Sequence, residues 1–238
     1  VLFRSQTFAV QVYEVRSNIQ EERVRPYSSA LASSTLISLL TSPDSCVSSN
    51  DSRIIDLSKS LVAREKNPYR QAKILYEYLV NNFALREEIR TGDVDALDML
   101  SLRYGDAYDF AILYTALCRA VGIAAMPVSG IVVDTGNVAR NHWRTELYFE
   151  NFGFFPVDCA SALSFENAKS YYFGNLEGRH IVFSRGWNQI KPSMLNGKIV
   201  YRPRTYALQS IWEEASESTS NYSSLWNNPI IIGIEQIR

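Results

Sequence analysis

The stretch from residue 105 to residue 122 constrains the fold most, because it joins a polar start to a long apolar run and a glycine stop. Asp106 can cap a helix, since its carboxylate can accept backbone N–H groups of the first turn. Apolar residues then recur at helical spacing: Phe110, Ala111, Tyr114, Leu117, Cys118 and Val121. Gly122 suits the left-handed position that ends many helices. We therefore predict a buried helix that starts at Asp106 and ends at Gly122.

Other helices are predicted before this one. Asp51 can cap a helix whose apolar residues follow at helical spacing. Asn67 followed by Pro68 is a strong start signal, because the amide caps the helix and the missing proline N–H costs nothing in the first turn. A short third helix is expected over residues 93–100.

After Gly122 the apolar period changes to that of strands. We predict strands over residues 124–133, 142–150 and 154–158, with a hairpin turn at residues 151–153. Further strand candidates are residues 181–184, 198–201 and 230–237. Because helices come first and strands follow, we predict an α+β domain in which N-terminal helices pack on a mostly antiparallel sheet.

The N-terminal part is predicted to be separate. Residues 7–15 alternate like a strand, and residues 23–27 form a second candidate extended piece. Residues 42–52 are rich in Ser, Asp, Asn and Pro, which is typical of a loop. We therefore expect an N-terminal β-strand segment at residues 1–45, either an appendage or the end of a preceding β domain. The main domain is expected at residues 46–238, with a polar loop over residues 213–224.

The composition is that of an ordinary globular protein, with 46% apolar and 21% charged residues among 238. A net charge of −1, with both signs mixed along the chain, gives no electrostatic reason to expect nucleic acid or an anionic membrane as partner. No apolar run approaches the ~20 residues that a membrane helix needs. The 14 Tyr, 11 Phe and 4 Trp leave two interpretations open: a Tyr-rich core and surface, or an aromatic-lined cleft for peptide or sugar.

The cysteines do not suggest a metal or a disulfide scaffold. Cys46, Cys118 and Cys159 have neither the framework of a disulfide-rich protein nor a metal-ligand spacing. We therefore expect no metal and no cofactor. The chain begins at Val1 without Met and without the pattern of a signal peptide, so we expect a trimmed or processed chain.

The start of the predicted central helix suits a nucleophile. The positive end of the helix dipole and the free N–H groups favour a thiolate and can bind an oxyanion. Position 107 is where such a nucleophile belongs, yet the residue is Ala107. His142 heads one predicted strand and Asp158 ends the next, and an antiparallel hairpin brings these two ends together. We predict that Asp158 orients His142, which acts as a base.

These residues also have structural interpretations. His142 could make only a structural hydrogen bond at the sheet edge, and Asp158 could serve as a turn or cap residue. Asp109 could act near the site, but an exposed first-turn aspartate that favours the helix dipole is the simpler interpretation.

Other candidates for the chemistry are weaker. Cys118 lies about 16 Å along the helix from position 107 and is expected in the core. Cys159 follows Asp158, and strand alternation would turn it to the opposite face. The second histidine, His180, has only Glu177 as a nearby carboxylate in the sequence.

Four phrases follow one another along the chain: Gly-Asp-Ala-Tyr-Asp-Phe-Ala at 105–111, Leu-Cys-Arg-Ala-Val-Gly-Ile-Ala-Ala at 117–125, Asn-His-Trp at 141–143 and Phe-Pro-Val-Asp at 155–158. They resemble the phrases of the bacterial transglutaminase-like superfamily, a papain-related group of Cys-His-Asp enzymes. In that family the first phrase is Gly-X-Cys-X-Asp-(Tyr/Phe)-Ala and the third is His-(Ala/Ser)-Trp. The resemblance covers residues 51–192 and implies a papain-like fold.

The resemblance also implies acyl transfer, in which a cysteine attacks a glutamine side chain or a peptide bond and the thioester passes to water or an amine. By position, Ala107 occupies the nucleophile's place, His142 is the base, Asp158 orients it, and Tyr108 and Trp143 are substrate-binding. Alanine has no lone pair to attack a carbonyl, so we expect the chain as it stands to be inactive. His142 is followed directly by Trp143, and this departure from the family phrase could shift the histidine in register.

Three interpretations stay open: an enzyme silenced by replacement of its cysteine, a natural pseudoenzyme that binds peptide or glycan, and a scaffold module of a cell-envelope protein. The expected partner is a protein or peptide, including cell-wall peptide, and the oligomeric state is open. Frequent export in the family implies a periplasmic or envelope location.

Overall fold

The computed structural model describes residues 7–44, 46–86, 95–134, 136–165, 167–186 and 229–235, together with the backbone of two short strands, β9 (Ser193–Leu195) and β10 (Lys198–Val200). The prediction for residues 213–224 lies outside the described residues. No described helix is long and apolar enough to cross a membrane.

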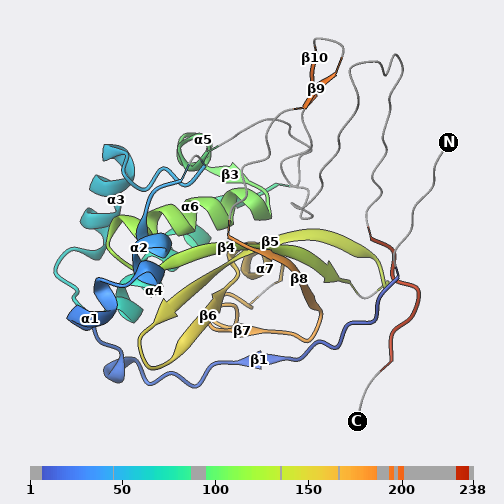
Figure 1. Cartoon of the computed structure of the whole chain (residues 1–238), viewed down its shortest axis with the longest axis horizontal. Helices are drawn as coiled ribbons and strands as arrows, with labels where there is room; N and C mark the ends of the chain where they lie inside the picture. The colour runs from blue at the N-terminus through green and yellow to red at the C-terminus, as the bar shows by residue number, and fades with distance from the viewer. Residues whose placement is uncertain are drawn as a thin grey trace.

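Helices make up the first half of the described chain (Figure 1). A 3-10 turn (Glu21–Arg23) and two short helices, α1 (Ser29–Ala32) and α2 (Thr35–Thr41), precede α3 (Ser52–Val62) and α4 (Pro68–Asn82). Then come α5 (Ala96–Leu102) and the central helix α6 (Ala107–Ala120). The two predicted caps are confirmed: Asp51 accepts the N–H of Arg53, and Asn67 accepts those of Tyr69 and Arg70.

A four-stranded antiparallel sheet forms the second half, in the order β6-β5-β4-β8. Its strands are β4 (Ala125–Val133), β5 (Ala139–Phe149), β6 (Gly153–Val157) and β8 (His180–Arg185). A short helix, α7 (Cys159–Ser164), follows β6. Three two-stranded pairs complete the described strands: β1 (Val15–Arg16) with β7 (Asn175–Leu176), β2 (Ala84–Leu85) with β3 (Tyr104–Gly105), and β9 with β10.

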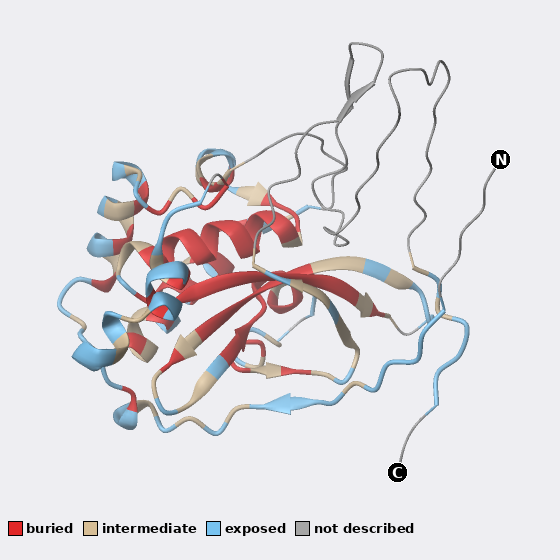
Figure 2. Ribbon diagram, in the orientation of Figure 1, coloured by how far each residue is buried: buried red, intermediate tan, exposed pale blue. Residues whose placement is uncertain are grey.

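The central helix α6 lies between the sheet and the other helices, packing on β4 and β5 on one side and on α3, α4 and α5 on the other (Figure 1). Figure 2 shows α6 and the middle of β4 and β5 as the most continuous buried part of the molecule. The predicted helix is confirmed, with Asp106 as its cap and Gly122 in the left-handed region at φ +82°. The helices and mostly antiparallel strands confirm the predicted α+β class.

Two strand predictions at the ends of the chain are wrong within the described residues. Of residues 7–15, only Val15 is in a strand, where β1 pairs with β7. Residues 229–235 form no strand, and Ile230, Ile232 and Ile234 are exposed. Alternation predicts a strand only when a neighbour is there to pair with it, and the described chain offers none to these segments.

The N-terminal residues pack on the main domain. Residues 21–23 form a 3-10 turn, and Val24, which follows it in an extended conformation, enters the principal core. Ile37 and Leu40 of α2 form a second cluster with Met126 and Val128 of β4. The division into residues 1–45 and 46–238 stays a prediction, and these contacts tie the two parts together.

Candidate active site

The start of α6 is held by two aspartates. Asp106 accepts the N–H of Asp109 through Oδ1 at 3.2 Å, and Asp109 accepts the N–H of Asp106 through Oδ2 at 2.8 Å. This reciprocal capping box fixes the first turn, of which Ala107 is the first residue. The expectation that Asp109 is exposed is wrong: it is 2% exposed, because its carboxylate turns back onto the cap instead of out to solvent.

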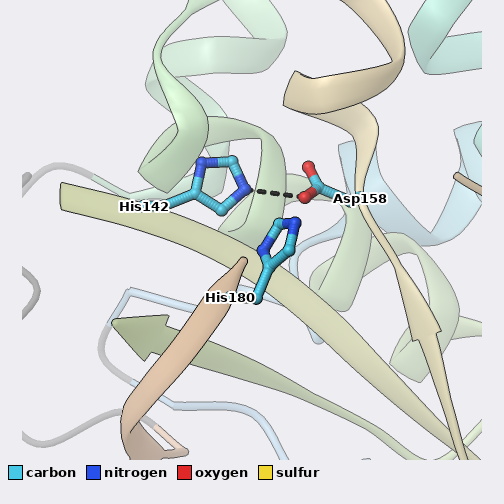
Figure 3. A group of neighbouring side chains, drawn as sticks. All are labelled: His142, Asp158 and His180. Atoms are coloured by element: carbon cyan, nitrogen blue, oxygen red, sulfur yellow. Dashed lines mark hydrogen bonds and ion pairs between the residues drawn. The ribbon is translucent and has the colours of Figure 1, made fainter. Parts of the chain in front are cut away.

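His142 of β5 and Asp158, directly after β6, meet side chain to side chain (Figure 3). His142 Nε2 lies 2.7 Å from Asp158 Oδ2. The strand register explains the contact. Thr145 of β5 pairs with Val157, the last residue of β6, so Asp158, which follows, lies toward the start of β5. The side chain of His142 is 12% exposed and that of Asp158 is fully buried. The structure brings the pair together, and the catalytic roles stay a prediction.

Asp158 is held in place from a third direction. It caps α7, where Oδ1 accepts the N–H of Ser161 at 2.9 Å and Oδ2 accepts the Ser161 hydroxyl at 2.8 Å. Burial alone would raise the pKa of Asp158, but His142, His180 and the Ser161 N–H hold the pKa well below its usual range. An ionised carboxylate can only accept, so a neutral His142 carries its proton on Nε2 and leaves Nδ1 as the basic nitrogen.

Aromatic packing links the start of α6 to the start of β5. The rings of Tyr108 and Trp143 meet edge to face with centroids 5.1 Å apart. Further along, the Thr145 hydroxyl donates to the carbonyl of Ala111 at 3.1 Å. Ala107 and His142 therefore lie at the same end of these two elements.

The two predicted substrate-binding residues are buried. Tyr108 is 1% exposed and Trp143 is 2% exposed. Their shared contact holds α6 against β5, and a role in substrate binding stays a prediction.

No cysteine among the described residues takes the place of the missing thiol. Cys46, Cys118 and Cys159 are all buried. Burial raises the pKa of both Cys118 and Cys159, which disfavours the reactive thiolate. Cys118 is confirmed as a core residue, whereas Cys159 begins α7 rather than continuing a strand.

The model of the transglutaminase-like superfamily matches residues 55–159. Residues 55–159, less than half of the chain, are thus similar in sequence to this superfamily. This segment includes Ala107, His142 and Asp158, and it ends before His180.

Three proteins show how similar this chain is to known sequences and structures. An uncharacterized protein of Haemophilus influenzae is 23% identical over 171 residues, which cover 56% of this chain and 46% of that protein. A candidate cysteine protease from Cytophaga hutchinsonii aligns with a TM-score of 0.53 at 19% identity, over 68% of this chain and 52% of its own. The periplasmic domain of TgpA from Pseudomonas aeruginosa aligns with a TM-score of 0.38 at 24% identity, over 45% of this chain and 43% of its own.

The chain thus spans about half the length of the relatives that it matches. With the family match, the likeness to the Cytophaga protein confirms the papain-like, transglutaminase-type fold. At this level of identity the likeness concerns the fold alone.

A second imidazole, outside the matched segment, lies beside the His142–Asp158 pair, and it was not expected from the sequence. His180, the first residue of β8, lies with its ring centroid 5.4 Å from that of His142, and its ring points toward Asp158 (Figure 3). The local sequence around His180 offers only Glu177 as a nearby carboxylate. The pairing of β8 with β4, which brings it to the site, is not visible in the local pattern.

Proposed function

We propose that this transglutaminase-like domain holds a Cys-His-Asp acyl-transfer site that lacks its nucleophile. The observation that supports it most is the 2.7 Å contact between His142 Nε2 and Asp158 Oδ2, at the same end of the fold as the capped start of α6. Ala107 is the first residue of that helix, where the family has its cysteine. The chain as it stands is therefore inactive in covalent acyl transfer from peptide or glutamine side chains.

The residues that remain have defined parts in this proposal. Asp158, fixed by Ser161, holds the Nε2–H of His142 and leaves Nδ1 to take a proton from a thiol. The dipole of α6 favours the resulting thiolate at its N-terminus. Restoring sulfur at position 107 would then supply the one atom that the reaction needs.

A second candidate function is non-catalytic binding of peptide or glycan, or a scaffold role in an exported envelope protein. Ala107 favours it, because a domain without a nucleophile can keep its fold and its contacts without turnover. A peptide or glycan that binds the natural chain, and binds more weakly after His142→Gln, would support the binding role over the scaffold role.

Alkylation of Ala107→Cys tests the proposal. Ser52→Cys is a matched control, because Ser52 is also the first residue of a helix capped by an aspartate, Asp51, whereas both histidines of the chain lie beside Asp158. Iodoacetamide would be applied near pH 6, where an ordinary thiol with a pKa of about 8.5 reacts slowly. Labelling of the unsubstituted chain measures the background from its three buried thiols, and this background is subtracted.

We expect the thiol at position 107 to be labelled at least about tenfold faster than the one at position 52, and the excess to vanish in Ala107→Cys/His142→Gln. Equal rates at the two positions would overturn the proposal. All variants are first compared by circular dichroism, so that loss of fold is not mistaken for loss of activation.

A further inference from the structure

Both histidines of the chain converge on one buried carboxylate. The chain contains 2 His among 238 residues, and both belong to this cluster. One side-chain nitrogen each from His142 and His180 and one oxygen from Asp158 lie within 4.8 Å of one another (Figure 3). They come from three separate parts of the chain: the start of β5, the start of β8 and the cap of α7.

His180 has a buried nitrogen with no hydrogen-bond partner. Its side chain is 8% exposed, and Nε2 accepts or donates no hydrogen bond among the described residues. The nearest carboxylate oxygen, Oε2 of Glu177, forms an ion pair with His180 Nε2 at 3.6 Å, a separation longer than a hydrogen bond. An unsatisfied polar atom in this position costs free energy unless something binds it.

A close approach of strands creates the cluster. Gly130 of β4 pairs with His142 on one side and Val182 on the other, at a bulge in the β4–β8 pairing. A β-carbon on Gly130 would lie 1.9 Å from the carbonyl oxygen of Ile181, so only glycine lets β8 come this near. His180 thereby reaches across β4 toward Asp158.

We propose that His142, His180 and Asp158 bind a divalent transition-metal ion. Two imidazoles and one carboxylate are a common donor set for Zn²⁺ and for Fe²⁺ with open positions. A tetrahedral ion with bonds of about 2 Å holds its ligand atoms roughly 3.3 Å apart. The distances between the three candidate ligand atoms range from 2.7 Å, between His142 Nε2 and Asp158 Oδ2, to no more than 4.8 Å. This range includes the tetrahedral value, so small side-chain rotations would bring the three atoms to the spacing that an ion needs.

The surroundings support a cation. Ser161 fixes Asp158 through two hydrogen bonds, as outer partners fix metal ligands in other proteins. Arg144 lies on the same face of β5 and lines the cavity beside the histidines, with its Nη2 paired with Glu146 at 2.9 Å. Glu177 lies beside His180 and is also paired with Arg179 at 3.5 Å.

A small cavity borders both imidazoles. It has a volume of about 10 Å³ and is lined in part by His142, His180 and Gly130. That is about the space of one water molecule, which could occupy a coordination position of the ion that the protein leaves open.

Binding requires the other tautomer of neutral His142. The hydrogen on Nε2 must move to Nδ1, so that the Nε2 lone pair can face the ion. The inference uses the same His142–Asp158 pair as the proposed function but does not depend on acyl transfer, because it concerns the chain as it stands, with Ala107.

Titration of the natural chain with Co²⁺ and Zn²⁺ tests this inference, using protein without a histidine tag. Visible absorption of Co²⁺ reports nitrogen and oxygen ligands, whereas intense thiolate bands would report cysteine. The variants are His180→Gln and Asp158→Asn, the second of which keeps an oxygen to cap α7. Asp51→Asn is the matched control, because Asp51 is also a helix cap but lies outside the cluster.

We expect one Co²⁺ per chain, displaced by Zn²⁺, with a Kd at least about tenfold weaker in His180→Gln and in Asp158→Asn and unchanged in Asp51→Asn. The inference is overturned by a Kd above about 100 µM for the natural chain, by unchanged binding in a folded His180→Gln, or by thiolate bands. The alkylation test of position 107 is run with EDTA, so the two proposals fail independently.

Discussion

At the scale of residues, the site is organised around Asp158, whose carboxylate contacts His142 and Ser161 and faces His180. The sequence predicts the His142–Asp158 contact, because hairpin geometry alone brings the start of one strand to the end of the next. It also offers the interpretation of Asp158 as a helix cap, and both are correct. The two functions are compatible because Oδ1 serves the cap and Oδ2 serves the imidazole.

We predict that Asp158→Asn lowers the free energy of unfolding by about 1–3 kcal/mol near neutral pH, since the amide cannot replace the charged acceptor. A carboxyl whose folded pKa is depressed stabilises the protein above its unfolded pKa, and that contribution is lost as the pH falls toward the folded value. The advantage of the natural chain should therefore shrink below about pH 4. Urea unfolding at several pH values measures it, and a pH-independent difference would contradict the prediction.

At the scale of elements, caps and apolar period predicted α3, α4, α6, β4, β5 and β6 with small shifts at their ends. These elements carry their own signals, such as Asp106 before α6 or the turn at residues 151–153 between β5 and β6. A strand was expected over residues 181–184, but its place beside β4 in the sheet could not be predicted. That place depends on a bulge and on the absence of a side chain at Gly130. His180 was missed for that reason.

We predict that Gly130→Ala destabilises the protein by about 2–4 kcal/mol, because its β-carbon would overlap the backbone of β8. Gly136→Ala is the control, since the nearest atom to its β-carbon would be 3.4 Å away, at the tip of the Asp134 side chain. Thermal unfolding of both variants measures the difference. Equal melting temperatures would mean that β8 can move aside at little cost.

At the scale of the whole molecule, the N-terminal segment packs on the sheet, and the hydroxyl of Tyr27 makes two of the contacts between them. The Tyr27 hydroxyl donates to the carbonyl of Tyr148 at 2.7 Å and accepts the N–H of Ala124 at 2.9 Å. Composition and loop signals near residues 42–52 suggested a separate segment, because sequence patterns do not report which distant backbone groups a side chain satisfies. These bonds and the Ile37–Leu40 cluster join it to β4 and β5.

We predict that Tyr27→Phe lowers stability by about 1–3 kcal/mol, because it leaves the Ala124 N–H and the Tyr148 carbonyl without this partner. Tyr13→Phe is the control, since Tyr13 is 69% exposed. Burial raises the pKa of Tyr27 to about 12, so its stabilising effect is complete below the ordinary tyrosine value of about 10 and is lost as the pH rises toward 12. Denaturant unfolding measures the free energy of unfolding of both variants. Equal values for Tyr27→Phe and Tyr13→Phe would show that the N-terminal segment is not docked through Tyr27.

The pH dependence of alkylation at position 107 tests the central claim, that the domain is a Cys-His-Asp site lacking only its sulfur. Rates of Ala107→Cys and Ser52→Cys would be measured with iodoacetamide across the range in which thiols ionise. The account predicts that the thiol at position 107 reaches its thiolate rate at clearly lower pH, and that His142→Gln moves its profile back to that of position 52. Coincident profiles in the presence of His142 would contradict the account.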